Sequence, residues 1–173
     1  MTVASTADWQ SRVDALWAIF DSLDAEAFLQ KMRALAAERP DNDPVALFEL
    51  ASAHDSTDHE TEAAALYRQA LALGLPSDLR RRATIQLAST LRNLGQAEAA
   101  VALLRAEQSA PSDQLDDAVT AFLALSLSDL GREREALSLA LTALSPHLPR
   151  YNRSLGNYAK ALVNPYHYRR TPR

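Results

Sequence analysis

The chain has 173 residues, enough for one domain or one short repeat array, and Ala and Leu supply 61 of them against 17 for Val, Ile and Thr. Because Ala and Leu lose little entropy in a helix and β-branched residues are restricted there, this composition predicts an all-α protein. The absence of cysteine excludes disulfides, thiolate metal sites and a cysteine nucleophile, while the net charge of -4 conceals a basic end, because no acidic residue follows Glu135.

Two amphipathic helices are predicted at the start of the chain, at about residues 7–21 and 25–38. In the first, large apolar side chains such as Trp9 and Trp17 recur on one face at helical spacing. Asp24 stands where the second helix begins and can accept a hydrogen bond from its free backbone N–H groups. We expect this N-terminal pair, residues 1–41, to cap the array, because its large side chains can cover an exposed end of the core.

Clear start and stop signals mark the next two helices. Asp43 followed by Pro44 predicts an N-cap and the first residue of a helix. Asp58 is predicted to cap the helix that follows the turn at 55–58. That helix is predicted to end at Gly74, which suits the left-handed conformation of a helix C-terminus.

Five more helices are predicted from the apolar periodicity that follows. One opens after Ser77 and stops at the turn of Gly95, and another opens after Ser112 and stops at Gly131. Each of these two is followed by a partner helix, and a last helix at about 152–163 is expected to cap the array. The segment from 150 to 173, which includes a basic tail, forms a separate C-terminal part in this interpretation.

Prolines divide the chain at a near-constant period. Pro40, Pro76, Pro111 and Pro146 are separated by 36, 35 and 35 residues. Proline cannot continue a helix, but it is tolerated in the first turn of the next one. A fixed period of this length therefore predicts a solenoid of helical pairs.

Three units between 43 and 149 share one pattern of residues. Its first helix has a large residue, then a Leu–small pair, then an aromatic or large residue, and its second helix has alanine, a large residue, alanine and a closing proline. The matching residues are Leu47, Leu50, Ala51, His54, Ala63, Tyr67, Ala70 and Pro76 in the first unit, Thr84, Leu87, Ala88, Leu91, Gly95, Ala100, Leu104 and Pro111 in the second, and Thr120, Leu123, Ala124, Leu127, Gly131, Ala136, Ala140, Ala143 and Pro149 in the third. These units resemble the tetratricopeptide repeat. They depart from its pattern at the first large position of two units, which is threonine, at His54 in an aromatic position and at Glu107 in an alanine position.

This resemblance implies an α-α superhelix of about nine helices whose concave face holds a peptide segment of another protein. It places the first helix of each pair on that face, and the residues it nominates for binding are Phe48, Arg82, Ile85, Gln86, Ser89, Arg92 and Asn93. Arginine beside serine and asparagine suits a carboxylate, so the expected partner carries an acidic segment or presents a C-terminal carboxylate. The alternatives are a solvated polar face and, for Phe48, a place in the core.

Other functions have weaker support. His54, Asp55, Asp58, His59 and Glu60 are metal-ligand types, but the two histidines are five apart across a turn, so we expect no metal. No phosphate loop, HExxH or G-x-S-x-G motif occurs, which favours a non-catalytic protein without cofactors.

Two binding alternatives remain open at this point. The basic end could pair with the acidic body of a second copy to form a homodimer. It could also contact nucleic acid weakly, although the acidic body would oppose this. Residues 1–10 have no basic residue and no apolar core, and no apolar run approaches the roughly 20 residues that span a bilayer, so we expect a cytoplasmic protein without a membrane partner.

Overall fold

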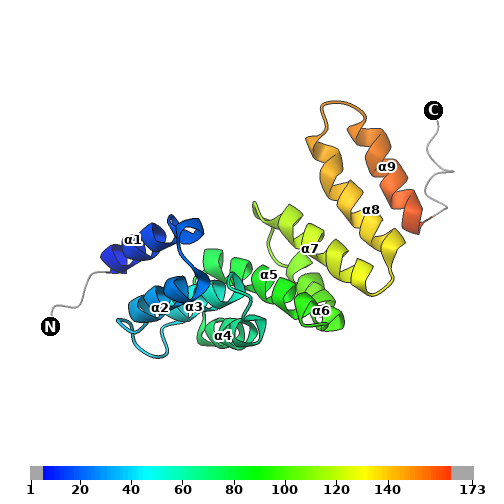
Figure 1. Cartoon of the computed structure of the whole chain (residues 1–173). Coiled ribbons are helices and arrows are strands. Elements are labelled where there is room, and N and C mark those ends of the chain that lie inside the picture. Colours follow the sequence, from blue (N-terminus) through cyan, green and yellow to red (C-terminus); the bar gives the residue numbers. More distant parts are fainter. Residues whose placement is uncertain (1–5, 165–173) are drawn as a thin grey trace. The chain divides into compact units, whose positions relative to one another are not determined.

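The computed structural model describes residues 6–164, and within this range all regular secondary structure is helical (Figure 1). The α-helices are α1 (Thr6–Trp17), α2 (Ala25–Ala36), α3 (Pro44–Asp55), α4 (Glu60–Leu73), α5 (Ser77–Asn93), α6 (Ala97–Gln108), α7 (Asp116–Asp129), α8 (Glu133–Leu144) and α9 (Asn152–Val163). Short 3₁₀ helices lie at Phe20–Ser22 and Ser145–His147. The all-α class and the succession of helical hairpins are confirmed.

The chain divides into two compact units, residues 1–90 and 91–173, which we call unit 1 and unit 2. Helix α5 begins in unit 1, and its last three residues belong to unit 2. Consecutive helices pack against one another in both units, for example α3 with α4 and α7 with α8. The three-part division by repeats stays a prediction, because compactness and repeat boundaries are different properties of the chain.

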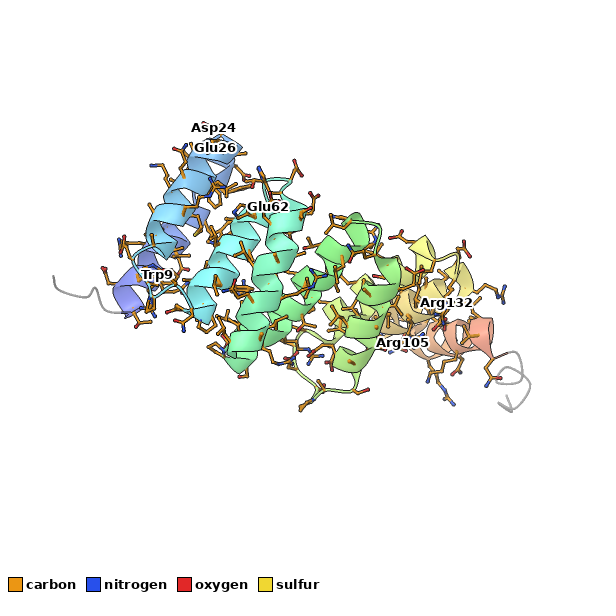
Figure 2. The ribbon with its side chains drawn as sticks, turned by 90° about the horizontal axis from the view of Figure 1, so that it is seen from below. Trp9, Asp24, Glu26, Glu62, Arg105 and Arg132 are labelled. Atoms are coloured by element: carbon orange, nitrogen blue, oxygen red, sulfur yellow. The ribbon has the colours of Figure 1, made fainter. Side chains whose placement is uncertain are left out.

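The N-terminal pair is held by aromatic side chains. Trp9 of α1 is almost fully buried, and its indole N–H donates to the Leu35 carbonyl of α2 at 2.8 Å (Figure 2). The predicted first helix ends earlier than expected, at Trp17, because the chain tightens into a 3₁₀ turn there. That turn brings the Phe20 ring to 4.7 Å from the Phe28 ring, an edge-on contact.

The predicted caps of α2 and α3 are confirmed. Asp24 accepts a hydrogen bond from the Ala27 N–H, and Asp43 accepts from the N–H groups of Val45 and Ala46. Each interaction satisfies a backbone donor that the helix itself cannot pair. These caps fix where α2 and α3 begin, and therefore which of their residues face the core.

The turns inside the three pairs α3–α4, α5–α6 and α7–α8 repeat one backbone motif. The N–H groups of His59, Gln96 and Arg132 donate to carbonyls five residues earlier, at His54, Leu91 and Leu127. The residue just before each donor has a positive φ: 60° at Asp58, 73° at Gly95 and 70° at Gly131. This left-handed conformation at a helix C-terminus favours glycine. The predicted N-cap role of Asp58 is therefore wrong. His59 holds the N-cap position of α4, and its side chain makes no capping hydrogen bond.

Replacing Asp58 by glycine is expected to raise the free energy of unfolding by about 0.5–1 kcal/mol. A residue with a Cβ is strained in the left-handed region, and glycine relieves that strain at some cost in unfolded-chain entropy. Urea unfolding of Asp58→Gly measures the gain, and Gly95→Asp, at the equivalent position, should show the opposite sign. A loss of stability in Asp58→Gly would contradict this interpretation of the turn.

Unit 2 continues the hairpin pattern around buried aliphatic side chains. Leu104 of α6 and Val119, Leu123 and Leu127 of α7 are fully buried. Arg105 of α6 and Arg132 converge in Figure 2 because both pair with Glu135 of α8. Together these contacts join α6, α7 and α8 into one body.

The last helix, α9, lies beside α8 in Figure 1, and its predicted bounds of 152–163 are confirmed. Helix α7 begins at Asp116 rather than directly after Ser112, because Asp113 accepts a hydrogen bond from the Leu115 N–H and holds 113–115 in a turn. The basic tail predicted at 164–173 lies outside the described residues except for Asn164. None of the described helices is long and apolar enough to span a membrane.

Candidate functional site

Unit 1 contains a partly open pocket of about 710 Å³ between α1, α3 and α5. We call it the unit 1 pocket. Its lining residues are Gln10, Asp14 and Trp17 of α1, Glu49, Ser52 and Ser56 at α3, and Asp78, Leu79, Arg82 and Gln86 of α5. The lining is mostly polar, which suits a ligand that makes hydrogen bonds rather than one held by apolar contact alone.

Glu49 is the most buried charged residue of the pocket lining, with only 7 % of its surface exposed. The Trp17 indole N–H donates to Glu49 Oε2 at 2.8 Å, which ties α1 to α3 at the pocket wall. Burial raises the pKa of Glu49, and hydrogen bonds from Trp17 and Gln10 and the charge of Arg82 only partly oppose this rise. A buried carboxylate beside an open pocket favours a ligand that brings a hydrogen-bond donor or a positive charge.

Arg82 lies above an aromatic floor. Its guanidinium carbon is 5.3 Å from the centre of the Phe48 ring, within the range of a cation–π contact. Phe48 in turn is 1 % exposed and packs against Tyr67 of α4, with ring centres 6.2 Å apart. Phe48 therefore acts from the core by supporting Arg82, rather than by presenting its own surface to a ligand.

A polar network joins α3, α4 and α5 behind the pocket. The Thr90 hydroxyl donates to Asp55 Oδ1 at 2.9 Å, and the Gln86 amide N–H lies 3.5 Å from Ser52 Oγ. The Tyr67 hydroxyl lies within hydrogen-bonding distance of Ser52 Oγ, at 3.3 Å. Burial raises the pKa of both Asp55 and Tyr67. The network holds the α3 and α5 faces of the pocket in a fixed relation within unit 1.

Among the described residues that line the pocket, there is more negative than positive charge. Three carboxylates, Asp14, Glu49 and Asp78, line it together with one guanidinium, Arg82. The amide oxygen of Gln86 is buried and has no hydrogen-bond partner among the described residues. This oxygen is shielded from the pocket space, so the chemistry that the lining offers to a ligand depends on its charged groups.

The structure separates the seven residues that the sequence grouped together. Arg82 and Gln86 line the unit 1 pocket, and Phe48 lies beneath Arg82. Ile85 is 6 % exposed and Ser89 is half-buried on α5, and neither lines the pocket.

The other two members of the predicted group lie in unit 2. Arg92 forms an ion pair with Asp129 of α7, and Asn93 ends α5 in an exposed position. Because α5 crosses the boundary between the units, helical spacing alone could not show that this group is divided.

Sequence reasoning missed the contribution of α1 and of Glu49. Glu49 did leave a signal, because it is a single carboxylate between Phe48 and Leu50 in an otherwise apolar stretch of α3. Such a position is buried or half-buried by its neighbours, and a buried carboxylate is uncommon without a partner or a function. Trp17 was assigned only to the core, whereas its indole N–H reaches the pocket wall.

The histidine-containing turn is a packing feature. His54 is 6 % exposed, its ring meets the His59 ring edge-on at 5.6 Å, and His59 Nδ1 lies 3.1 Å from the Thr57 hydroxyl. Burial lowers the pKa of His54, which favours the neutral ring. Across the described residues, no three His, Cys, Asp or Glu side chains are grouped so that they could hold a metal ion.

Comparison with known proteins gives one match. A family model described as Tetratrico peptide repeat matches residues 44–162, which include α3 to α8 and nearly all of α9. No curated protein matches the chain, and no solved structure matches it. The matched region begins after α1 and α2, so the α1 residues of the pocket lie outside it.

Proposed function

The chain belongs to the tetratricopeptide repeat family, whose members are generally protein–protein interaction modules and typically non-catalytic, and on this basis we propose that it holds a segment of a partner protein in the unit 1 pocket. The observation that carries the proposal is the pocket between α1, α3 and α5, with the buried Glu49 carboxylate in its wall. A partner segment would lie against Arg82 and Gln86 and would offer a hydrogen-bond donor to Glu49.

The charges of the pocket support a segment with a basic side chain. An acidic segment would meet the favourable charge of Arg82, but it would also meet the carboxylates of Asp14, Glu49 and Asp78. Contacts between like charges in a binding site cost roughly several kcal/mol. A lysine or arginine side chain would meet these three carboxylates, which can accept its hydrogen bonds. The acidic partner expected from the arginines alone is therefore the weaker of the two proposals.

Replacing Glu49 by glutamine is expected to weaken binding of basic peptides by at least about tenfold, because it removes a charge partner in a buried setting. The experiment selects binders from a displayed library of random 12-residue peptides and measures the affinity of the enriched peptides by fluorescence polarisation. Glu62→Gln is the matched control, since Glu62 is an exposed residue of α4 outside the pocket (Figure 2).

The result that supports the proposal is enrichment of lysine and arginine, with binding lost in Glu49→Gln and kept in Glu62→Gln. Enrichment of acidic peptides that need Arg82 but not Glu49 would instead restore the acidic partner. If the enriched peptides bind Glu49→Gln, Glu62→Gln and Arg82→Ala as tightly as they bind the parent protein, the pocket is not the binding site.

The same binding should depend on pH in a defined direction. Burial raises the pKa of Glu49, so on acidification this carboxyl becomes neutral at a higher pH than an exposed one. Affinity for a basic peptide should then fall as the pH is lowered through that raised pKa, and the fall should be smaller in Glu49→Gln. Affinities measured from pH 8 down to pH 4, a range that reaches below the ordinary glutamate pKa of about 4.3, test this. A steeper fall in the variant would contradict it.

A further inference from the structure

A second, apolar groove lies in unit 2, between α7 and α8. It has a volume of about 490 Å³, and its lining residues are Ala121, Ala124, Leu125, Ser128, Glu133, Ala136, Leu137 and Ala140. Leu125 is 46 % exposed and Leu137 is 49 % exposed, so large apolar side chains flank a floor of alanines. Among the described residues of this lining, Glu133 is the only charged one.

The groove lies where the α7–α8 pair lacks a large side chain that the two preceding repeat pairs have. In the second helix of the α3–α4 pair, the buried Ala63 is followed four residues later by Tyr67. In the second helix of the α5–α6 pair, the buried Ala100 is followed four residues later by Leu104. Tyr67 and Leu104 are both fully buried. In the third pair the buried alanine is Ala136, but the residue four positions later is Ala140, which is exposed. The α7–α8 pair therefore lacks the large side chain that fills the equivalent position in the α3–α4 and α5–α6 pairs.

The end of α9 lies close to one end of the groove. Arg134 of α8 donates from its guanidinium to the Leu162 carbonyl at 3.1 Å, and Ser138 donates to the Ala159 carbonyl at 2.7 Å. The polypeptide therefore leaves α9 near the first turn of α8, where Glu133 lines the groove. From Glu133 to Ala140 the groove extends about 10 Å along α8 at the normal rise of a helix.

The residues that follow have a sequence that suits the groove. Residues 165–173, outside the described part of the chain, read PYHYRRTPR, with two tyrosines, three arginines and no acidic residue. Four extended residues beyond Asn164 span about 13 Å, enough to bring Tyr168 to the level of Ala140. Tyrosine matches the side chain that Tyr67 supplies in the first pair, and the arginines complement Glu133.

We propose that residues 165–170 of the same chain occupy the α7–α8 groove and that Tyr168 fills the place left open by Ala140. The tail then covers the apolar floor between Leu125 and Leu137. This inference is independent of the unit 1 pocket and holds whether or not that pocket binds a peptide.

Photocrosslinking of the full chain tests the proposal. Tyr168 is replaced by benzoylphenylalanine, which keeps an aromatic ring and attaches to neighbouring C–H groups on illumination. We expect a monomeric product whose crosslinked peptides, identified by mass spectrometry, come from α7 and α8. Benzoylphenylalanine at Tyr151 is the control, because Tyr151 is 77 % exposed and does not line the groove.

A groove variant makes the test specific. Ala140→Leu restores a large side chain at an exposed position, so the fold tolerates it, and circular dichroism verifies the helical content. It should lower the crosslink yield from position 168 by about fivefold, the ratio that roughly 1 kcal/mol of lost contact produces. Crosslinks that scatter over the chain, or a yield unchanged by Ala140→Leu, would overturn the proposal. A covalent dimer between isotopically light and heavy copies would overturn it in favour of a second copy as the occupant.

Discussion

Replacing Tyr67 by alanine is expected to lower the free energy of unfolding by about 3–5 kcal/mol, the range for removing a large buried aromatic side chain. Tyr67 is fully buried in α4, packs against Phe48 of α3, and places its hydroxyl near Ser52. Its loss leaves a cavity and at the same time removes the support beneath the Phe48–Arg82 contact. Urea unfolding followed by circular dichroism measures the effect.

Tyr67→Phe separates packing from hydrogen bonding. It keeps the ring and removes only the hydroxyl, so the expected loss is about 1 kcal/mol, the typical net value of one hydrogen bond. The Tyr67→Ala cost should therefore exceed the Tyr67→Phe cost severalfold. Equal costs in the two variants would mean that the polar network, and not ring packing, holds α3 and α4 together.

The second large effect is expected at the start of α3. Asp43→Ala should lower the free energy of unfolding by about 2 kcal/mol, the upper end for the loss of an N-cap. One carboxylate oxygen, Oδ1, accepts from the N–H groups of Val45 at 2.9 Å and Ala46 at 3.1 Å. The other oxygen, Oδ2, pairs with Arg39 at 2.6 Å, and the two side chains are only 20 % and 11 % exposed.

Asp43→Asn is the matched control, because asparagine is as good an N-cap as aspartate but carries no charge. It should keep the backbone hydrogen bonds and lose only the ion pair with Arg39, at a smaller cost than Asp43→Ala, which loses both. Thermal unfolding of the three proteins should give the order parent, Asp43→Asn, Asp43→Ala. If asparagine and alanine destabilise equally, the ion pair and not the cap carries the effect.

Local chemistry explains why so much of the fold could be predicted. The caps at Asp24 and Asp43 and the left-handed glycine at Gly74 each depend on a few neighbouring residues, which a sequence displays directly. Asp58 was misjudged because an aspartate suits both an N-cap and a left-handed helix end, and only the backbone distinguishes them.

The candidate site could be predicted only in part, because it depends on contacts between distant segments. Helical spacing placed Arg82 and Gln86 on one face, and they do line the same pocket. It could not show that Trp17, 32 residues away, would bond to Glu49, or that Arg92 would be paired with Asp129. The sequence predicted a site dominated by arginine, whereas the pocket has more carboxylates than guanidinium groups. Spacing along one helix could not show this, because the carboxylates come from three different helices.

Helix α1 would contribute to the choice of partner in the proposed function, although it lies outside the repeats. Gln10, Asp14 and Trp17 form one wall of the unit 1 pocket, yet they precede the stretch that matches the repeat family at 44–162. Under the proposed function, the repeats supply two walls of the pocket, and a helix that precedes the matched region supplies the third. Substitutions in α1 alone would then change which partner segments the pocket binds, while every repeat signature stays intact. A fragment limited to the repeats would lack that third wall.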